Sequence, residues 1–156
     1  MDHKPIFWFM KKINLLIFLF FISTYANDIK ADTKTSIKEY LNKKNIEDGA
    51  TQIYLLNRCS AVYTYASAII LKTDTENSKK FIDIANNLLF KSIELRIIDR
   101  KEKLEDARKK VEADREKLFQ NYINDGKKNW DKNKSYFKGS YISEDLSICE
   151  KLVNEK

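Results

Sequence analysis

The sequence predicts an all-α protein. We expect a small helical bundle with one apolar core helix, one long partly solvent-exposed helix and a short C-terminal helix held by a disulfide. The chain has 156 residues but only three Gly and one Pro, and Pro5 lies near its start. Sandwiches and barrels need Gly and Pro at many corners, so a β fold is excluded. Apolar residues instead recur at spacings of three and four, which is the pattern of helices.

The first 26 residues have the pattern of a cleaved secretory signal peptide. Lys11 and Lys12 precede an apolar stretch at residues 13–22, and small residues follow up to Ala26. The apolar stretch is shorter than the roughly 20 residues of a membrane span, although an uncleaved N-terminal anchor is the rival interpretation. We therefore predict cleavage after Ala26, a single all-α domain at residues 27–156, and an exported protein with the periplasm as its expected compartment.

Two cysteines, Cys59 and Cys149, follow the predicted cleavage site. In an exported protein an even number of cysteines favours a disulfide, and two cysteines allow one intramolecular pairing. Such a bond would close a loop of about 90 residues, for which chain-entropy models give about 4–5 kcal/mol as an upper figure. The alternatives are two buried thiols or a redox pair, but the Cys-x-x-Cys spacing of a redox pair is absent.

Four helices are expected, at about 33–44, 47–72, 76–124 and 143–154. The first has apolar residues at spacings of three and four. The second is apolar almost all round, with Arg58 as its only charge between Thr51 and Leu71. Such a helix is either a buried core helix or a membrane span, and Gln52, Asn57 and Arg58 make a span costly. Its small polar residues form a narrow stripe: Asn57, Ser60, Thr64 and Ser67.

The third helix is predicted to be long because residues 79–124 contain neither Gly nor Pro. At ~1.5 Å per residue it would span ~70 Å, so it either projects from the bundle or bends, near Asn86–Asn87 or near Asp99–Arg100. A seven-residue ladder of apolar residues runs along it: Phe90, Ile97, Leu104, Val111 and Leu118. Gly126 is expected to end this helix, and Ser143 to cap the last one.

The residue types after position 26 exclude most catalytic chemistry. This part of the chain has no His, and its three Gly do not form a phosphate-binding loop. Asp and Glu lie mostly on charged helical faces beside Lys and Arg, where solvated charge is the ordinary interpretation. We therefore expect no enzyme activity, no metal and no cofactor.

One segment could bind a ligand, namely the polar connector expected at residues 127–141. It combines basic with aromatic side chains: Lys127, Lys128, Trp130, Lys132, Lys134, Tyr136 and Phe137. Such residues bind anionic surfaces or stack on sugars. The competing interpretation is that the aromatic rings pack over the bundle and the lysines are solvated. Residues 27–156 have 26 basic and 22 acidic side chains, too small an excess to suggest nucleic acid.

Together these features predict a small exported helical protein of the cell envelope with a non-catalytic binding or structural role. Its partner would be an unknown protein, lipid or glycan, and the sequence leaves the oligomeric state open. The alternative is a periplasmic holdase-type chaperone for unfolded proteins. In compartment, size, charge and helicity alone, the chain resembles small basic helical chaperones of the Skp or Spy type. The Leu-Thr-x-x-Gln motif of the Spy type is absent from this chain.

Overall fold

The computed structural model describes residues 35–154, which belong to one compact unit. Within this range five helices form and no strand does, which confirms the all-α prediction. The helices are α2 (Ile37–Leu41), α3 (Gly49–Ile70), α4 (Thr75–Arg100), α5 (Leu104–Asn133) and α6 (Tyr141–Asn154). Across residues 35–154, no helix is both long and apolar enough to cross a membrane. The predicted signal peptide at 1–26 lies outside the described residues.

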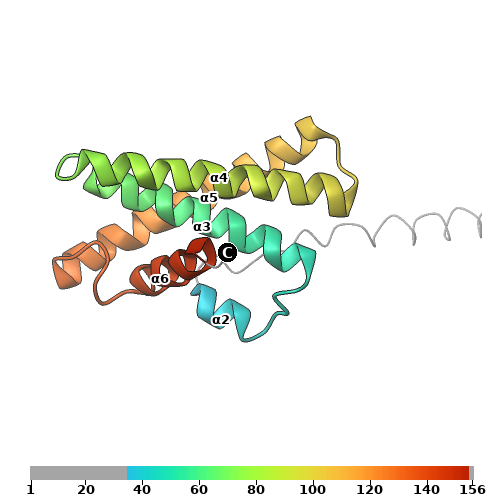
Figure 1. Ribbon diagram of the computed structural model, residues 1–156. Helices are drawn as coiled ribbons and strands as arrows, with labels where there is room; N and C mark the ends of the chain where they lie inside the picture. The colour runs from blue at the N-terminus through green and yellow to red at the C-terminus, as the bar shows by residue number, and fades with distance from the viewer. Residues whose placement is uncertain (1–34, 155–156) are drawn as a thin grey trace, which may run out of the picture. The chain divides into compact units, whose positions relative to one another are not determined.

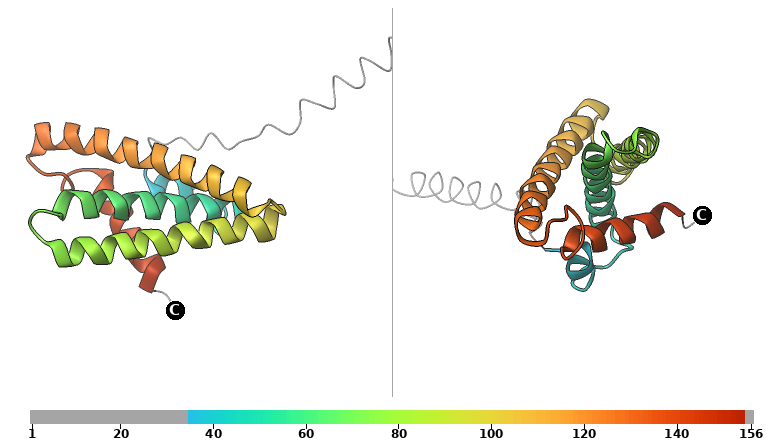
Figure 2. Two further views of the ribbon diagram at one scale, coloured as in Figure 1. Left: turned by 90° about the horizontal axis from the view of Figure 1, so that it is seen from above. Right: turned by 90° about the vertical axis from the view of Figure 1, so that its left-hand side faces the viewer.

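Three long helices, α3, α4 and α5, run side by side with alternating direction (Figure 1). The short helix α2 and the last helix α6 lie against another side of α3, and α6 crosses the long helices at a steep angle (Figure 2). Because α3 and α5 run in the same direction, their C-terminal ends meet at one end of the bundle, next to the turn from α3 to α4.

Helix α3 is the core of the bundle, as its apolar sequence predicted. Asp48 caps its start by accepting a hydrogen bond from the backbone N–H of Thr51 at 3.0 Å. Between Ile53 and Ser67 only two side chains are not buried. The predicted helix at 47–72 is therefore present, and its apolar circumference is covered by the other helices.

The narrow polar stripe on α3 lies partly at the contact with α4. Ser60 donates its hydroxyl to the backbone oxygen of Ala85 at 2.8 Å, and Ser67 makes the same kind of bond with Ser78 at 2.9 Å. Small side chains bring two helix backbones close together, and each hydroxyl is paired inside the interface. The stripe is thus a packing feature and not an exposed one.

A continuous helix over 76–124 is wrong, because the chain turns back after Arg100. The break lies at Asp99–Arg100, one of the two places where a bend was expected, but the chain reverses there and does not merely bend. Lys101 takes a left-handed backbone conformation with φ 54°, and α5 starts at Leu104 after a turn of three residues. A bidentate ion pair holds the turn, with Arg96 Nε and Nη2 at 3.0 and 2.9 Å from the two carboxylate oxygens of Glu102. Lys110 adds a second cation at 3.2 Å from Glu102.

Turning back buries apolar surface that a straight helix would leave in water. Two buried side chains of α4 form one cluster with two of α5: Leu89, Ile93, Ala107 and Val111. A non-glycine residue in the left-handed region costs about 1–2 kcal/mol. Burial of Leu, Ile and Val side chains, at about 1.5–3 kcal/mol each, exceeds that cost.

The predicted end of the helix at Gly126 is also wrong, because α5 continues to Asn133. Gly126 lies inside the helix and is buried against the Tyr65 hydroxyl, which occupies the place where a Cβ would be. Glycine is needed here for close approach and not for a turn. The last helix starts at Tyr141, two residues before the predicted cap at Ser143.

The predicted disulfide between Cys59 and Cys149 is confirmed. It joins α3 to α6, with 5.4 Å between the Cα atoms and 90 residues between the two cysteines in sequence. Both cysteines are fully buried, so the bond lies in the interior where α6 crosses α3. The prediction of a short C-terminal helix held by this bond is therefore correct.

Candidate functional site

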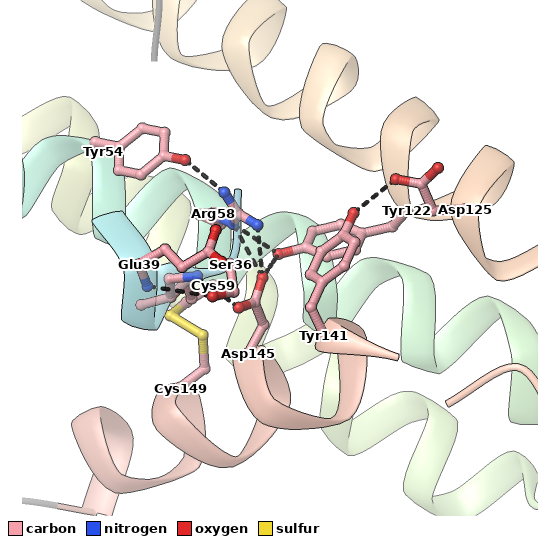
Figure 3. A network of polar contacts seen from close by, with 11 residues as sticks. Ser36, Glu39, Tyr54, Arg58, Cys59, Tyr122, Asp125, Tyr141, Asp145 and Cys149 are labelled. Carbon is pink, nitrogen blue, oxygen red and sulfur yellow. Dashed lines mark hydrogen bonds and ion pairs between the residues drawn. A yellow bond between two sulfur atoms is a disulfide. The ribbon is translucent and has the colours of Figure 1, made fainter. Parts of the chain in front are cut away.

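A buried polar network surrounds Arg58 at the crossing of α3 and α6 (Figure 3). The Arg58 guanidinium donates from Nε and Nη2 to Asp145 Oδ2, at 3.0 and 2.8 Å. Its Nε is also 3.0 Å from the Tyr122 hydroxyl of α5, and its Nη1 is 2.6 Å from the Tyr54 hydroxyl. The Tyr141 ring adds a cation–π contact at 5.7 Å.

Asp145 is the acceptor that connects four helices in this network. Besides Arg58 of α3, it accepts a hydrogen bond from the Tyr122 hydroxyl of α5 at 2.7 Å. Its other oxygen accepts from the backbone N–H of Ile37, the first residue of α2, at 2.7 Å. Burial raises the pKa of the Asp145 carboxyl, while the charge of Arg58 and these hydrogen bonds act in the opposite direction.

The network is closed to solvent. The Arg58 side chain is 1% exposed and the Asp145 side chain is not exposed at all. Burial raises the pKa of Tyr122 well above its ordinary value, so its hydroxyl keeps the proton that it donates. A dissolved ligand has no access to these groups, and we assign them a structural role at the junction of α2, α3, α5 and α6.

The exposed candidate site is the segment from Lys127 to Lys138, which we call the aromatic-basic segment. It was predicted as a connector, but Lys127, Lys128, Trp130 and Lys132 lie in the last two turns of α5. The following loop then folds back. It places the Tyr136 ring on the Trp130 indole, with 4.7 Å between ring centroids and 22° between ring planes. Trp130 nevertheless remains 42% exposed.

Phe137 belongs to the interior side of this loop. Its ring meets the Tyr65 ring of α3 edge to face at 5.6 Å, whereas Tyr136 stacks on Trp130. The aromatic residues of the segment thus differ in their surroundings. Phe137 packs on the bundle, and Trp130 with Tyr136 forms the solvent-facing pair.

Asn129 holds the loop in place, and sequence reasoning missed it. Its side-chain amide donates to the backbone oxygens of Ser135 and Lys138, at 2.7 and 2.9 Å. Asn133 donates to the Asn129 side-chain oxygen at 2.6 Å. Tyr65 fixes the loop from α3 by donating to the backbone oxygen of Tyr136 at 3.2 Å, and burial raises the pKa of Tyr65 to about 12. The stacked pair is thus preorganised by its supports.

The lysines of the segment are exposed and mostly unpaired. Lys128 forms an ion pair with Asp125 at 3.0 Å. Across residues 35–154, the ammonium groups of Lys127, Lys132 and Lys134 lie in no ion pair. Lys134 ends α5 in a left-handed conformation with φ 52°. The segment thus offers positive charges beside an exposed indole.

The described part of the chain, residues 35–154, contains no group of three or more side chains placed to hold a metal ion. Comparisons of the whole chain with protein-family models, with curated proteins and with solved structures found no significant match. The aromatic-basic segment is the candidate site because it combines an exposed indole with exposed lysines.

Proposed function

We propose that this protein is a non-catalytic binding protein of the cell envelope and that the aromatic-basic segment contacts an anionic lipid or glycan there. The observation that carries the proposal is the exposed Trp130 indole, stacked on the half-buried Tyr136 ring, among exposed lysines. Aromatic rings beside lysines provide apolar contact area and charge attraction to an anionic surface. A rigid loop lowers the entropy cost of binding, and the hydrogen bonds of Asn129 provide that rigidity.

The buried disulfide supports the exported location. Disulfides form and persist in oxidising compartments such as the periplasm and are rare in the cytosol. Cys59 and Cys149 are bonded, and the described residues 35–154 contain no other cysteine. Together with the basic and apolar pattern of residues 11–26, this favours export and the periplasm.

A binding assay with charge variants tests the proposal. Two anionic probes are used. The first is a vesicle of phosphatidylcholine with about one-third phosphatidylglycerol, and the second is the acidic polysaccharide alginate. Vesicles of phosphatidylcholine alone and neutral dextran are the blanks. We expect K127Q/K128Q/K132Q/K134Q to bind at least one anionic probe at least about tenfold more weakly than the parent, because each Lys near an anionic surface contributes about 1 kcal/mol.

The matched control is K43Q/K44Q/K109Q/K151Q, which removes four exposed lysines elsewhere. Its affinity should lie within about twofold of that of the parent protein, since the attraction between a lysine and an anionic surface falls off within a Debye length of roughly 8–10 Å. The proposal is wrong if the parent binds neither anionic probe, or if the two variants lose affinity equally.

The holdase alternative has one observation in its favour. Three large apolar side chains on α4 and at the start of α5 are more than half exposed: Phe90, Ile98 and Leu104. A holdase would use such a surface to bind unfolded clients, and would then suppress aggregation of an unrelated denatured protein at near-equimolar ratio. The chaperone would be favoured over the binding protein if the parent suppresses this aggregation but binds neither probe, and if F90S/I98S/L104S loses the suppression.

A further inference from the structure

The net positive charge of residues 27–156 lies at one end of the bundle. Residues 71–80 form the turn from α3 to α4 and the start of α4, and residues 125–138 form the end of α5 and the following loop. Both segments lie at the same end in Figure 1 and in the left view of Figure 2. They carry eight basic and four acidic side chains, while the other residues from position 27 onward carry eighteen of each. The whole positive excess therefore lies in these two segments.

The same end presents two exposed apolar side chains. Leu71, the C-cap residue that follows α3, is 52% exposed, and Trp130 in the last turn of α5 is 42% exposed. Lys72 follows Leu71 and is also exposed. Exposed apolar side chains at two neighbouring helix ends, with exposed lysines in the same segments, are typical of a membrane–water interface.

A lipid surface explains this arrangement better than a glycan does. One face of the Trp130 indole is covered by Tyr136, so a sugar ring could stack on the opposite face alone. Leu71 lies on a different helix and would contribute nothing to sugar stacking, whereas both apolar side chains can enter the interfacial layer of a bilayer. Lysines spread over two segments match the many phosphate groups of a lipid surface.

We infer that this end of the bundle docks on an anionic lipid bilayer, with Trp130 and Leu71 entering the interfacial layer and the surrounding lysines contacting lipid phosphates. This inference rests on the binding role proposed above and names its ligand. It also adds the turn from α3 to α4 to the contact surface. The long helices then stand with this end toward the bilayer.

Tryptophan fluorescence of the exported protein tests the inference directly. The chain has two tryptophans, and the first is Trp8. After the predicted cleavage Trp130 is the only one, and the mass of the recovered protein verifies that cleavage. On vesicles with about one-third phosphatidylglycerol we expect a blue shift of the emission, and quenching by lipids brominated on their acyl chains. Vesicles of phosphatidylcholine alone should produce neither change.

Two matched variants locate the contact. We expect L71S to weaken vesicle binding several-fold and to leave alginate binding unchanged. Phe90 is 60% exposed on α4 away from this end, so F90S should leave vesicle binding unchanged. Circular dichroism of both variants verifies that they fold.

The outcomes separate the inference from the proposed function. Binding to alginate without binding to anionic vesicles overturns the bilayer contact and leaves the proposed function intact. Binding to neither probe overturns both. Vesicle binding with an unshifted, unquenched Trp130, or equal losses from L71S and F90S, overturns the docking geometry.

Discussion

Arg58 and Asp145 form a buried ion pair directly beside the disulfide, with 2.8 Å between Nη2 and Oδ2. Arg58 precedes Cys59 by one residue on α3, and Asp145 precedes Cys149 by one helical turn on α6. Helix α6 is thus attached to the core helix by an ionic and a covalent link at the same crossing. Substitution of Asp145 removes the ionic link, and substitution of the two cysteines removes the covalent one. Their contributions to the free energy of unfolding can therefore be measured separately.

Removal of the charge at Asp145 should destabilise the fold strongly. We expect D145N to lower the free energy of unfolding by about 3–5 kcal/mol, because it leaves the buried Arg58 cation without its counter-ion. Denaturant-induced unfolding measures the change. E144Q is the control, since Glu144 pairs with Lys38 at the surface and should contribute less than about 1 kcal/mol. Equal effects of the two variants would contradict a structural role for the buried pair.

Loss of the disulfide should lower stability without releasing α6. We expect C59S/C149S to unfold at lower denaturant concentration, with at most about 4–5 kcal/mol lost for a loop of this length. Its helical circular dichroism in buffer should stay close to that of the parent, since the ion pair remains. Mass spectrometry should show the unreduced parent protein two hydrogens lighter than its reduced form. Complete alkylation of both thiols before reduction would contradict this prediction.

Replacement of Gly126 should show whether packing overrides helix propensity. Gly→Ala inside a helix ordinarily stabilises by up to about 1 kcal/mol. Here we expect G126A to destabilise by about 1–3 kcal/mol, because the new methyl group would collide with the Tyr65 hydroxyl. Thermal unfolding of G126A, Y65F and the double variant gives the coupling energy. Y65F should relieve part of the collision, and additive effects would show that the contact is unimportant.

The turn between α4 and α5 should make stability sensitive to acid. Hydrogen bonds from Arg96 hold the pKa of Glu102 below its ordinary value. A depressed pKa contributes stability at neutral pH, and this contribution is lost as the pH falls from about 4.5, the ordinary value, through the folded-state pKa. We expect E102Q to lose about 1–2 kcal/mol at pH 7 and to differ less from the parent at pH 3.

Unfolding measured at pH 7, 4 and 3 tests this dependence. E112Q, which changes an exposed carboxylate on α5 after the turn, is the control and should follow the parent at every pH. A difference between E102Q and the parent that stays constant from pH 7 to pH 3 would rule out the proposed contribution of Glu102.

The helical class, the core helix and the disulfide were predictable because each depends on composition or compartment. A bend near Asp99–Arg100 was one of two alternatives, but a full reversal at Lys101 was not predictable, because left-handed positions are usually marked by Gly or Asn. What holds it is the tertiary contact between Arg96 and Glu102 together with packing of α4 on α5. The seven-residue apolar ladder was misleading, because it suggested one helix although its residues belong partly to α4 and partly to α5. Its residues Phe90 and Leu104 are exposed, since the ladder continues across a turn.

At the candidate site, the residue types could be predicted from the sequence, but their arrangement in space could not. The lysines, Trp130 and Tyr136 were recognisable from their clustering. The role of Asn129 was not recognisable, because it is one polar residue among many in this stretch. Its hydrogen bonds to Ser135 and Lys138 exist only once the loop has folded back. Gly126 led to the wrong prediction of a helix end, because glycine occurs both at helix ends and where two segments approach closely. Only the Tyr65 hydroxyl beside it distinguishes the two cases.

The spacing of the two cysteines determines when the covalent link can form. If the chain is exported N-terminus first, as we propose, Cys59 reaches the oxidising side 90 residues before Cys149. Helices α3, α4 and α5 are consecutive hairpins and can assemble in that interval. The disulfide then forms after α3, α4 and α5 have packed together. Until α6 is exported, Cys59 has a free thiol that can form mixed disulfides. Alkylation of export intermediates arrested before residue 149 would detect this transient thiol.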